Sequence, residues 1–166
     1  MSKRAIVTGG AGFIGSYLVN LLQEKKFNVV VYDDLSNGSG KKNLRKGTKI
    51  IRGSILNYKK MKEIFKNSDM VFNLAVLPLP MSFDNPDRVV RVNDVGSYLV
   101  SKACTELKIK LFHVSSSEAY GTAKYETMSE NHPLLPTTVY AASKASSESY
   151  VRAFEQTSGL KFVIVR

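Results

Sequence analysis

The sequence has few of the residues that build disulfide scaffolds and metal sites. It contains one cysteine, Cys104, and two histidines, His113 and His132. A lone cysteine excludes a disulfide framework and a cysteine-built metal site. Two histidines leave too few ligands for a structural zinc ion, so we expect no metal. The sparing use of cysteine is typical of a reducing compartment, and we expect a cytoplasmic protein.

Long apolar runs are also missing. No stretch of about 18 consecutive apolar residues is present, which excludes a transmembrane helix. The first residues lead straight into a short apolar segment that ends in Thr8-Gly9-Gly10. They lack the apolar core and the cleavage site of a secretory signal. We therefore expect no membrane partner.

Acidic residues are scarce, since 14 Asp and Glu stand against 24 Lys and Arg, and the net charge is +10. Most of the excess falls in residues 41–66, which hold ten basic residues and one acidic residue, Glu63, and so contribute +9. Such a window either attracts polyanions, including nucleic acid, or forms a solvated face. No aromatic stacking platform or nucleic-acid motif accompanies it, so we favour the solvated face.

Strand-like and helix-like segments alternate along the 166 residues. Apolar runs predict strands at 5–8, 29–32, 49–52, 70–75, 110–115 and 161–166, and helical spacing predicts helices at 13–26, 57–67, 87–107 and 140–158. Strands that are apolar throughout are buried on both faces, as in a parallel sheet covered by helices. We predict one doubly wound α/β domain over residues 1–166. Because the sequence closes on a core strand, we expect it to be the N-terminal part of a longer chain.

A glycine-rich turn lies between the first predicted strand and helix. Read from Gly9 it is G-x-x-G-x-x-G, and read from Gly10 it is G-x-G-x-x-G. Glycines allow a tight turn and a close approach of pyrophosphate to backbone N–H groups at a helix N-terminus. Asp33 follows 24 residues after Gly9 at the end of the second strand, where a carboxylate can accept hydrogen bonds from ribose hydroxyls. That carboxylate would repel a 2′-phosphate, so the pattern favours NAD over NADP.

Tyr140 and Lys144 form a Y-x-x-x-K pair in the last predicted helix. Residues four apart share a helix face, so the phenol and the ammonium group would point into one site. A nearby Lys⁺ and the positive nicotinamide of NAD⁺ would stabilise a phenolate that acts as a base. A serine-rich segment, residues 114–121, follows the fifth strand, where ligands of open α/β sheets bind. One of its hydroxyls could bond a reacting oxygen beside the tyrosine, although a plain serine-rich turn explains the segment by itself.

Taken together, these segments resemble the extended short-chain dehydrogenase/reductase family, in particular its NAD-dependent nucleotide-sugar epimerases and dehydratases. TGGAGFIGS, DDLSNG, NLA, Asn93-x-x-Gly96, SSSEAYG and YAASK occur in the family's order. The resemblance implies a Rossmann fold, NAD as cofactor, a nucleotide-sugar substrate and a homodimer. It implies cofactor contacts at Gly9, Gly12, Phe13, Ile14, Gly15, Asp33, Asn37, Ser54, Ile55, Leu74, Ala75, Val76, Asn93, Tyr140 and Lys144. It implies catalytic roles for Ser116, Glu118, Tyr140 and Lys144.

The resemblance also implies a mechanism, most like that of a UDP-sugar 4-epimerase. Tyr140 would remove the proton of the sugar 4-hydroxyl while hydride passes to NAD⁺, Lys144 would hold the nicotinamide ribose, and Ser116 would orient the oxygen. The transient 4-keto sugar would then be reduced on its other face. A 4,6-dehydratase or a decarboxylase is the alternative, because Glu118 falls where dehydratases carry an acidic residue. A Rossmann module that binds NAD without chemistry is the further alternative.

Two departures from the family pattern bear on these expectations. Ser54 stands where the family's Gly-Asp-Ile segment has an aspartate that contacts the adenine amino group, which implies a weaker contact there. Family members are also about twice as long, and their C-terminal half builds the nucleotide-sugar pocket. We therefore expect this chain to lack the C-terminal substrate domain and most substrate contacts.

Overall fold

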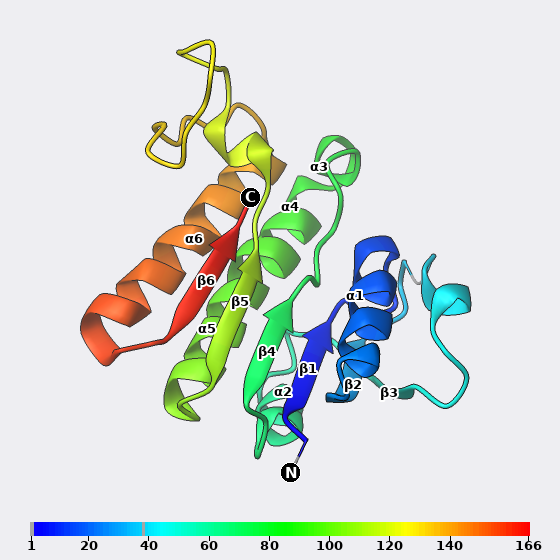
Figure 1. Cartoon of the computed structure of the whole chain (residues 1–166). Helices are drawn as coiled ribbons and strands as arrows, with labels where there is room; N and C mark the ends of the chain where they lie inside the picture. The colour runs from blue at the N-terminus through cyan, green and yellow to red at the C-terminus, as the bar shows by residue number, and fades with distance from the viewer. Residues whose placement is uncertain (1, 38) are drawn as a thin grey trace.

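Six parallel strands form one sheet in the computed structural model, which describes residues 2–37 and 39–166 (Figure 1). The strand order is β3-β2-β1-β4-β5-β6, which is the order of the Rossmann fold. The strands are β1 (Arg4–Thr8), β2 (Asn28–Asp33), β3 (Lys49–Arg52), β4 (Met70–Asn73), β5 (Lys110–Val114) and β6 (Phe162–Val165). The predicted doubly wound α/β fold is confirmed.

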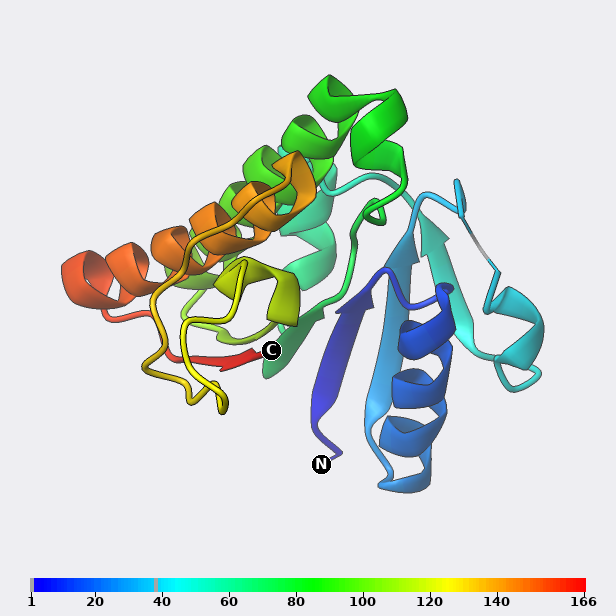
Figure 2. The same cartoon turned by 90° about the horizontal axis from the view of Figure 1, so that it is seen from above.

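Helices lie on both sides of the sheet, as Figure 2 shows. The longer ones are α1 (Phe13–Glu24), α2 (Tyr58–Phe65), α5 (Gly96–Glu106) and α6 (Val139–Ser158). The shorter ones are α3 (Met81–Asp84), α4 (Pro86–Val89), the π-helical turn η2 (Val90–Val95) and the 3₁₀ turns η1 (Lys41–Asn43) and η3 (Ser117–Tyr120). None of the helices in the described residues is long and apolar enough to cross a membrane.

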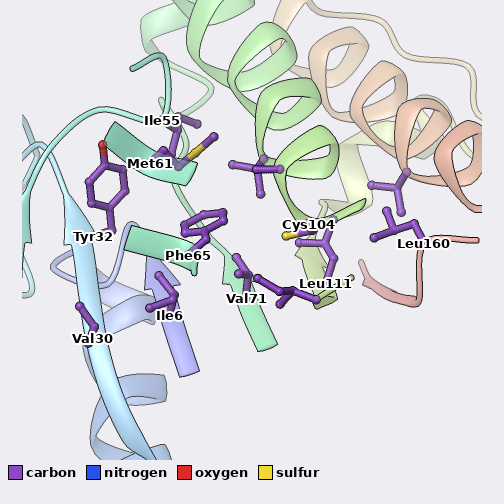
Figure 3. Close-up of a cluster of buried hydrophobic side chains, with 14 residues drawn as sticks. Ile6, Val30, Tyr32, Ile55, Met61, Phe65, Val71, Cys104, Leu111 and Leu160 are labelled. Carbon is purple, nitrogen blue, oxygen red and sulfur yellow. The ribbon is translucent and has the colours of Figure 1, made fainter. Parts of the chain in front are cut away.

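Alternate side chains of the central strands enter two separate apolar clusters. On one face, Val7 and Val31 pack with Val19 and other side chains of α1. On the other face, Ile6 and Val71 belong to a larger cluster with side chains of α2, α5 and α6 (Figure 3). Burial on both faces explains why β1 and β2 are apolar along most of their length. The edge strand β6 was expected to be a core strand, but its Val163 and Val165 are exposed.

The chain reverses its direction of winding between β1 and β4, which are neighbours in the sheet. The chain moves outward from β1 to β2 and β3, and in the opposite direction from β4 to β5 and β6. The loops after β1 and β4 therefore diverge and leave a crevice beyond the carboxyl ends of the strands. This crevice is where the sequence predicts the ligand.

The predicted helix at 87–107 differs from the structure. Helical structure begins one residue earlier, because Pro86 needs no N–H partner in a first turn and the Asn85 side chain accepts from the backbone N–H of Arg88 (3.1 Å). The segment is then α4, the π-helical turn η2 and α5 in succession, not one regular helix. The fourth strand also ends at Asn73, two residues earlier than predicted. Gly38, the last residue of DDLSNG, lies outside the described residues.

Candidate active site

A pocket of about 350 Å³ lies at the crevice beyond the strand ends. Fourteen of the residues predicted from the sequence line it: Gly9, Gly12, Phe13, Ile14, Gly15, Asp33, Asn37, Ser54, Ile55, Leu74, Ala75, Val76, Tyr140 and Lys144. Asn93, Ser116 and Glu118 were also predicted as site residues and do not line it. The lining residues that sequence reasoning missed are Tyr32, Asp34, Ser36, Ser39, Gly53, Leu77, Pro78, Val92, Val114 and Ser115.

The glycine turn is packed too tightly for any larger residue at two positions. A Cβ on Gly15 would lie 2.2 Å from the carbonyl oxygen of Gly9, and a Cβ on Gly9, whose φ is +68°, would lie 2.6 Å from the backbone of Leu74 and Ala75. Gly12 caps α1 without any side-chain hydrogen bond to the first turn. The first N–H groups of the helix can therefore bind an anion that enters the pocket.

Asp33 joins the end of β2 to this turn. One carboxylate oxygen accepts from the backbone N–H of Ala11 (2.9 Å) and the other from that of Leu35 (2.8 Å). Each carboxylate oxygen has a second lone pair. The side chain can therefore hold the turn and still accept a hydrogen bond from a ligand hydroxyl.

Tyr32 and Gly53 shape the pocket beside Asp33. The Tyr32 hydroxyl donates to the carbonyl oxygen of Ser54 (3.0 Å), and its ring lies 2.5 Å from where a Cβ on Gly53 would stand. A larger residue at position 53 would therefore displace the Tyr32 ring. The Ser54 hydroxyl accepts from the backbone N–H of Leu56 (3.2 Å) and stabilises the same turn. The apolar character of strand β2 gave no signal that Tyr32 would line the pocket.

Asn93 supports the pocket from behind. Its side chain accepts from the Leu77 N–H (2.7 Å) and donates to the Leu77 carbonyl (3.0 Å), and the residue is buried. It thus fixes the segment at 74–78 that forms one wall of the pocket. The Thr8 hydroxyl accepts from the Ala75 N–H (3.3 Å) and ties the same wall to β1.

The opposite end of the pocket is formed by α6. Its first turn is capped by Thr138, whose hydroxyl accepts from the Ala141 N–H (3.0 Å). Tyr140 and Lys144 follow on one face, as predicted. The Lys144 ammonium donates to the carbonyl oxygen of Val114 at the end of β5 (2.6 Å).

Burial lowers the pKa of Lys144 from 10.5 to about 8, and the negative charge of Glu148 opposes that shift. Most Lys144 side chains are therefore still charged at pH 7. A charged amine held at the pocket wall stabilises a negative oxygen nearby.

His113 lies behind Lys144 and does not line the pocket. Burial and the charge of Lys144 lower the pKa of His113 from 6.5 to about 3, so the ring is neutral. Ser147 donates its hydroxyl proton to the Lys144 carbonyl (2.7 Å) and so accepts from His113 Nε2 (3.0 Å). His113 Nδ1 then accepts from the side-chain amide of Asn73 (3.3 Å). The ring is a structural link between β4, β5 and α6.

Ser116 and Glu118 lie on the short turn that follows β5. The Ser116 hydroxyl accepts from the Glu118 N–H (3.2 Å) and so caps η3. Glu118 is exposed. Ser115, which is buried, is the serine of this segment that lines the pocket.

The basic window at 41–66 spans η1, β3 and α2. Several of its side chains have partners within the molecule: Arg45 pairs with Glu24, Lys62 with Glu106, and Lys66 with Glu63. Such exposed pairs contribute little to stability but lower the charge presented to a polyanion. Within the window, residues 53–55 line the pocket and residues 41–52 do not.

Three kinds of comparison place the chain among known proteins. Residues 5–166 match the family model described as NAD dependent epimerase/dehydratase family. A dTDP-glucose 4,6-dehydratase of Actinoplanes sp. is 32% identical, over 98% of this chain and 55% of its own length. The chain thus spans about half the length of the curated relatives it matches.

Solved structures agree with this likeness. A UDP-N-acetylglucosamine 4-epimerase from Methanobrevibacter ruminantium, in complex with UDP-N-acetylmuramic acid, is 35% identical with a TM-score of 0.93, over 99% of this chain and 54% of that one. A UDP-glucose 4-epimerase from Thermus thermophilus, in complex with NAD, is 33% identical with a TM-score of 0.90, over 98% of this chain and 54% of that one.

Proposed function

The chain belongs to the NAD-dependent epimerase/dehydratase family, and we propose that it is the NAD-binding part of a nucleotide-sugar epimerase of the UDP-sugar 4-epimerase type. One observation carries the proposal: a single pocket is lined at one end by the glycine turn and at the other by Tyr140 and Lys144. In this arrangement the glycine turn would hold the pyrophosphate of a dinucleotide, and Tyr140 and Lys144 would face its reactive end.

The residues present fit NAD. The chain packs closely at Gly9 and Gly15, and the first turn of α1 has no side-chain cap, so its backbone N–H groups are available to a ligand, which suits a pyrophosphate. Asp33 accepts hydrogen bonds at the end of β2, which suits the hydroxyls of the adenosine ribose. Its negative charge disfavours a 2′-phosphate, so NAD is preferred over NADP.

In the proposed reaction, Tyr140 takes the proton of the sugar 4-hydroxyl and later returns it. Lys144 would hold positive charge beside the phenolate and would donate a hydrogen bond to the nicotinamide ribose of bound NAD. Ser116 orients the sugar oxygen, with Ser115 nearer the pocket. When bound, NAD supplies the acceptor for the sugar C4 hydride and afterwards the donor that reduces the 4-keto sugar.

A 4,6-dehydratase or decarboxylase is the second candidate, and Glu118 favours it. The glutamate lies on the same turn as Ser116 and its side chain is exposed, so it is free to reach a sugar bound above the pocket. The known relatives include a dTDP-glucose 4,6-dehydratase. A module that binds NAD without chemistry would have no use for Tyr140 and Lys144 together in the pocket.

The activity is tested with the 166-residue chain and with the product of its complete reading frame. NAD released by denaturation is identified by mass spectrometry, and the protein is then incubated with UDP-glucose, UDP-N-acetylglucosamine or dTDP-glucose and followed by NMR. Inversion at C4 supports the epimerase, and a 4-keto-6-deoxy product that disappears in Glu118→Gln supports the dehydratase. Bound NAD without turnover of any of these sugars in either protein leaves only the binding module.

A homodimer is a further part of the proposal. Tyr98 of α5 stacks edge-on against Tyr150 of α6 (5.4 Å between ring centroids) and lies 5.7 Å from Phe154. All three rings are only partly buried, and aromatic side chains of this kind are enriched at interfaces. Light scattering of Tyr98→Glu against the wild-type chain tests it: a dimer that dissociates supports the proposal, and a wild-type monomer contradicts it.

A further inference from the structure

Glu148 is a buried acidic residue that the proposed chemistry does not use. It lies on α6 one helical turn after Lys144 and two turns after Tyr140, so the three side chains share one face of the helix. Glu148 is fully buried. A buried carboxylate persists in a fold only with a well-made partner.

Arg166 supplies that partner through a two-pronged ion pair. Its Nε donates to the Glu148 carboxylate (2.9 Å), and one terminal nitrogen donates to the other carboxylate oxygen (2.6 Å). The other terminal nitrogen donates to the Tyr120 hydroxyl (2.9 Å) and to the Glu130 carbonyl (3.1 Å). The guanidinium group also lies 4.7 Å from the centre of the Tyr120 ring.

These contacts join three parts of the fold. Tyr120 closes the turn η3, which begins next to Ser116 and includes Glu118. Glu130 lies in the loop that follows. Glu148 belongs to the helix that carries Tyr140 and Lys144. Arg166 is thus bonded at once to the turn, to the loop and to the helix.

We propose that Glu148, Arg166 and Tyr120 are positioning residues of the candidate active site: the buried ion pair fastens the turn that carries Ser116 and Glu118 to the helix that carries Tyr140 and Lys144. The inference rests on the proposed function, because positioning has a purpose only if the two groups act on one substrate. Arg166 suits this task better than lysine would, because its planar fork binds the carboxylate with two bonds and still donates to the turn.

The same ion pair sets the charge around Lys144. The groups that face the Lys144 amine are Tyr140 and Glu148 on its own helix, neutral His113 on β5, and Arg166 behind Glu148. Glu148 is the negative group among them and favours the charged amine. Its removal, with Arg166 left in place, therefore makes Lys144 lose its proton at lower pH.

The experiment measures amide hydrogen exchange and the pH profile of Lys144 labelling, without NAD or substrate. The first variant is Glu148→Gln. The second, Arg166→Lys, keeps the positive charge but loses the two-bond contact of the guanidinium group with the carboxylate. The third, Tyr120→Phe, keeps the aromatic ring but loses the hydroxyl. Glu24→Gln is the matched control, because it breaks the exposed pair with Arg45. Lysines are acetylated at a series of pH values, and peptide mass spectrometry measures the labelling of Lys144 at each pH. The pH at which this labelling is half-maximal is the Lys144 midpoint.

We expect residues 117–135 to exchange about tenfold faster or more in Glu148→Gln and Arg166→Lys, and less so in Tyr120→Phe, while β1 and β2 keep their wild-type rates. We expect the Lys144 midpoint to fall in Glu148→Gln and to stay near the wild-type value in Arg166→Lys. Glu24→Gln should change neither quantity.

A merely structural ion pair gives a different result. Exchange then rises over the whole domain, and the Lys144 midpoint rises towards that of an ordinary lysine as water enters. Either outcome, or wild-type exchange of residues 117–135 in folded Arg166→Lys and Tyr120→Phe, overturns the proposal. The exchange and labelling experiments use no NAD or substrate, so their failure is distinct from a failure of the proposed function. The proposed function is tested separately by an NADH titration of the wild-type chain.

Discussion

Alanine at Gly15 and alanine at Gly12 are expected to have different effects, although the two glycines lie in the same turn. The Cβ of Gly15→Ala would lie 2.2 Å from the carbonyl oxygen of Gly9, which is 1.2 Å inside the 3.4 Å at which ordinary contact begins. Gly9 cannot easily move, because its carbonyl accepts from the Gly12 N–H (3.0 Å) and its N–H donates to the Tyr32 carbonyl (3.1 Å). The Cβ of Gly12→Ala has a single close neighbour, the same oxygen at 3.1 Å, and otherwise projects towards the pocket.

The magnitudes follow from this geometry. Overpacking of this kind costs about 1–3 kcal/mol, and about 1 kcal/mol lowers the Tm of a domain of this size by about 2–4 °C. We therefore expect Gly15→Ala to lower the Tm by about 5 °C and to weaken NADH binding as well. Gly12→Ala should keep a Tm within about 2 °C of the wild type, since its strain is smaller, and should weaken binding about tenfold or more, which corresponds to about 1.4 kcal/mol.

Calorimetry and a fluorescence titration with NADH measure the two quantities on the same preparations. A Gly15→Ala variant that melts at the wild-type temperature, or a Gly12→Ala variant that binds NADH as tightly as the wild type does, would be the opposite of what we expect. The first result would mean that the turn relaxes freely, and the second that the pyrophosphate lies elsewhere.

Three other predictions concern stability and charge. The pKa of His113 is about 3 in the folded chain and ordinarily 6.5. As the pH falls from 6.5 towards 3, His113 therefore binds a proton in the unfolded chain but not in the folded chain, and the folded chain loses stability. Urea unfolding should then show a loss of about 2 kcal/mol between about pH 7 and pH 5, and a His113→Gln variant that keeps the full loss would contradict this assignment. Thr138→Ala should lower the free energy of unfolding by about 1 kcal/mol, because it removes the cap of α6, whereas Thr138→Ser should stay within a few tenths; equal losses in both would argue against capping. The chain should elute from a DNA column below physiological salt, because the basic window already has internal partners; retention at physiological salt that declines as Lys59 and Lys60 are replaced would instead indicate a nucleic-acid surface.

The order of strands and helices was predictable because it depends on local apolar periodicity. Runs such as Val29-Val30-Val31 are buried on both faces of the sheet, and their pattern is visible in the sequence alone. The glycine turn and the Tyr140–Lys144 pair were predictable for a similar reason, because each is a short motif with a fixed spacing.

The remaining parts of the site depend on contacts between distant residues. Asn93 was predicted to touch the cofactor, but its partner is the backbone of Leu77, and a helical pattern does not reveal that. Tyr32 reads as an ordinary strand residue, and only the folded chain shows that its ring packs against Gly53 and lines the pocket. The partners Glu148 and Arg166 lie 18 residues apart on different elements, so no local sequence pattern indicates that they pair beside the site.

The proposed function requires that a dinucleotide lies across the carboxyl edge of the sheet, from the N-terminus of α1 to the first turns of α6. A crystal structure of the chain soaked with NAD⁺ tests it most directly. We expect density for the pyrophosphate against the N–H groups of Phe13 and Ile14, and for the nicotinamide ring beside Tyr140 and Lys144. A crevice without density at saturating NAD⁺, or a nicotinamide ring bound away from these two side chains, would contradict it.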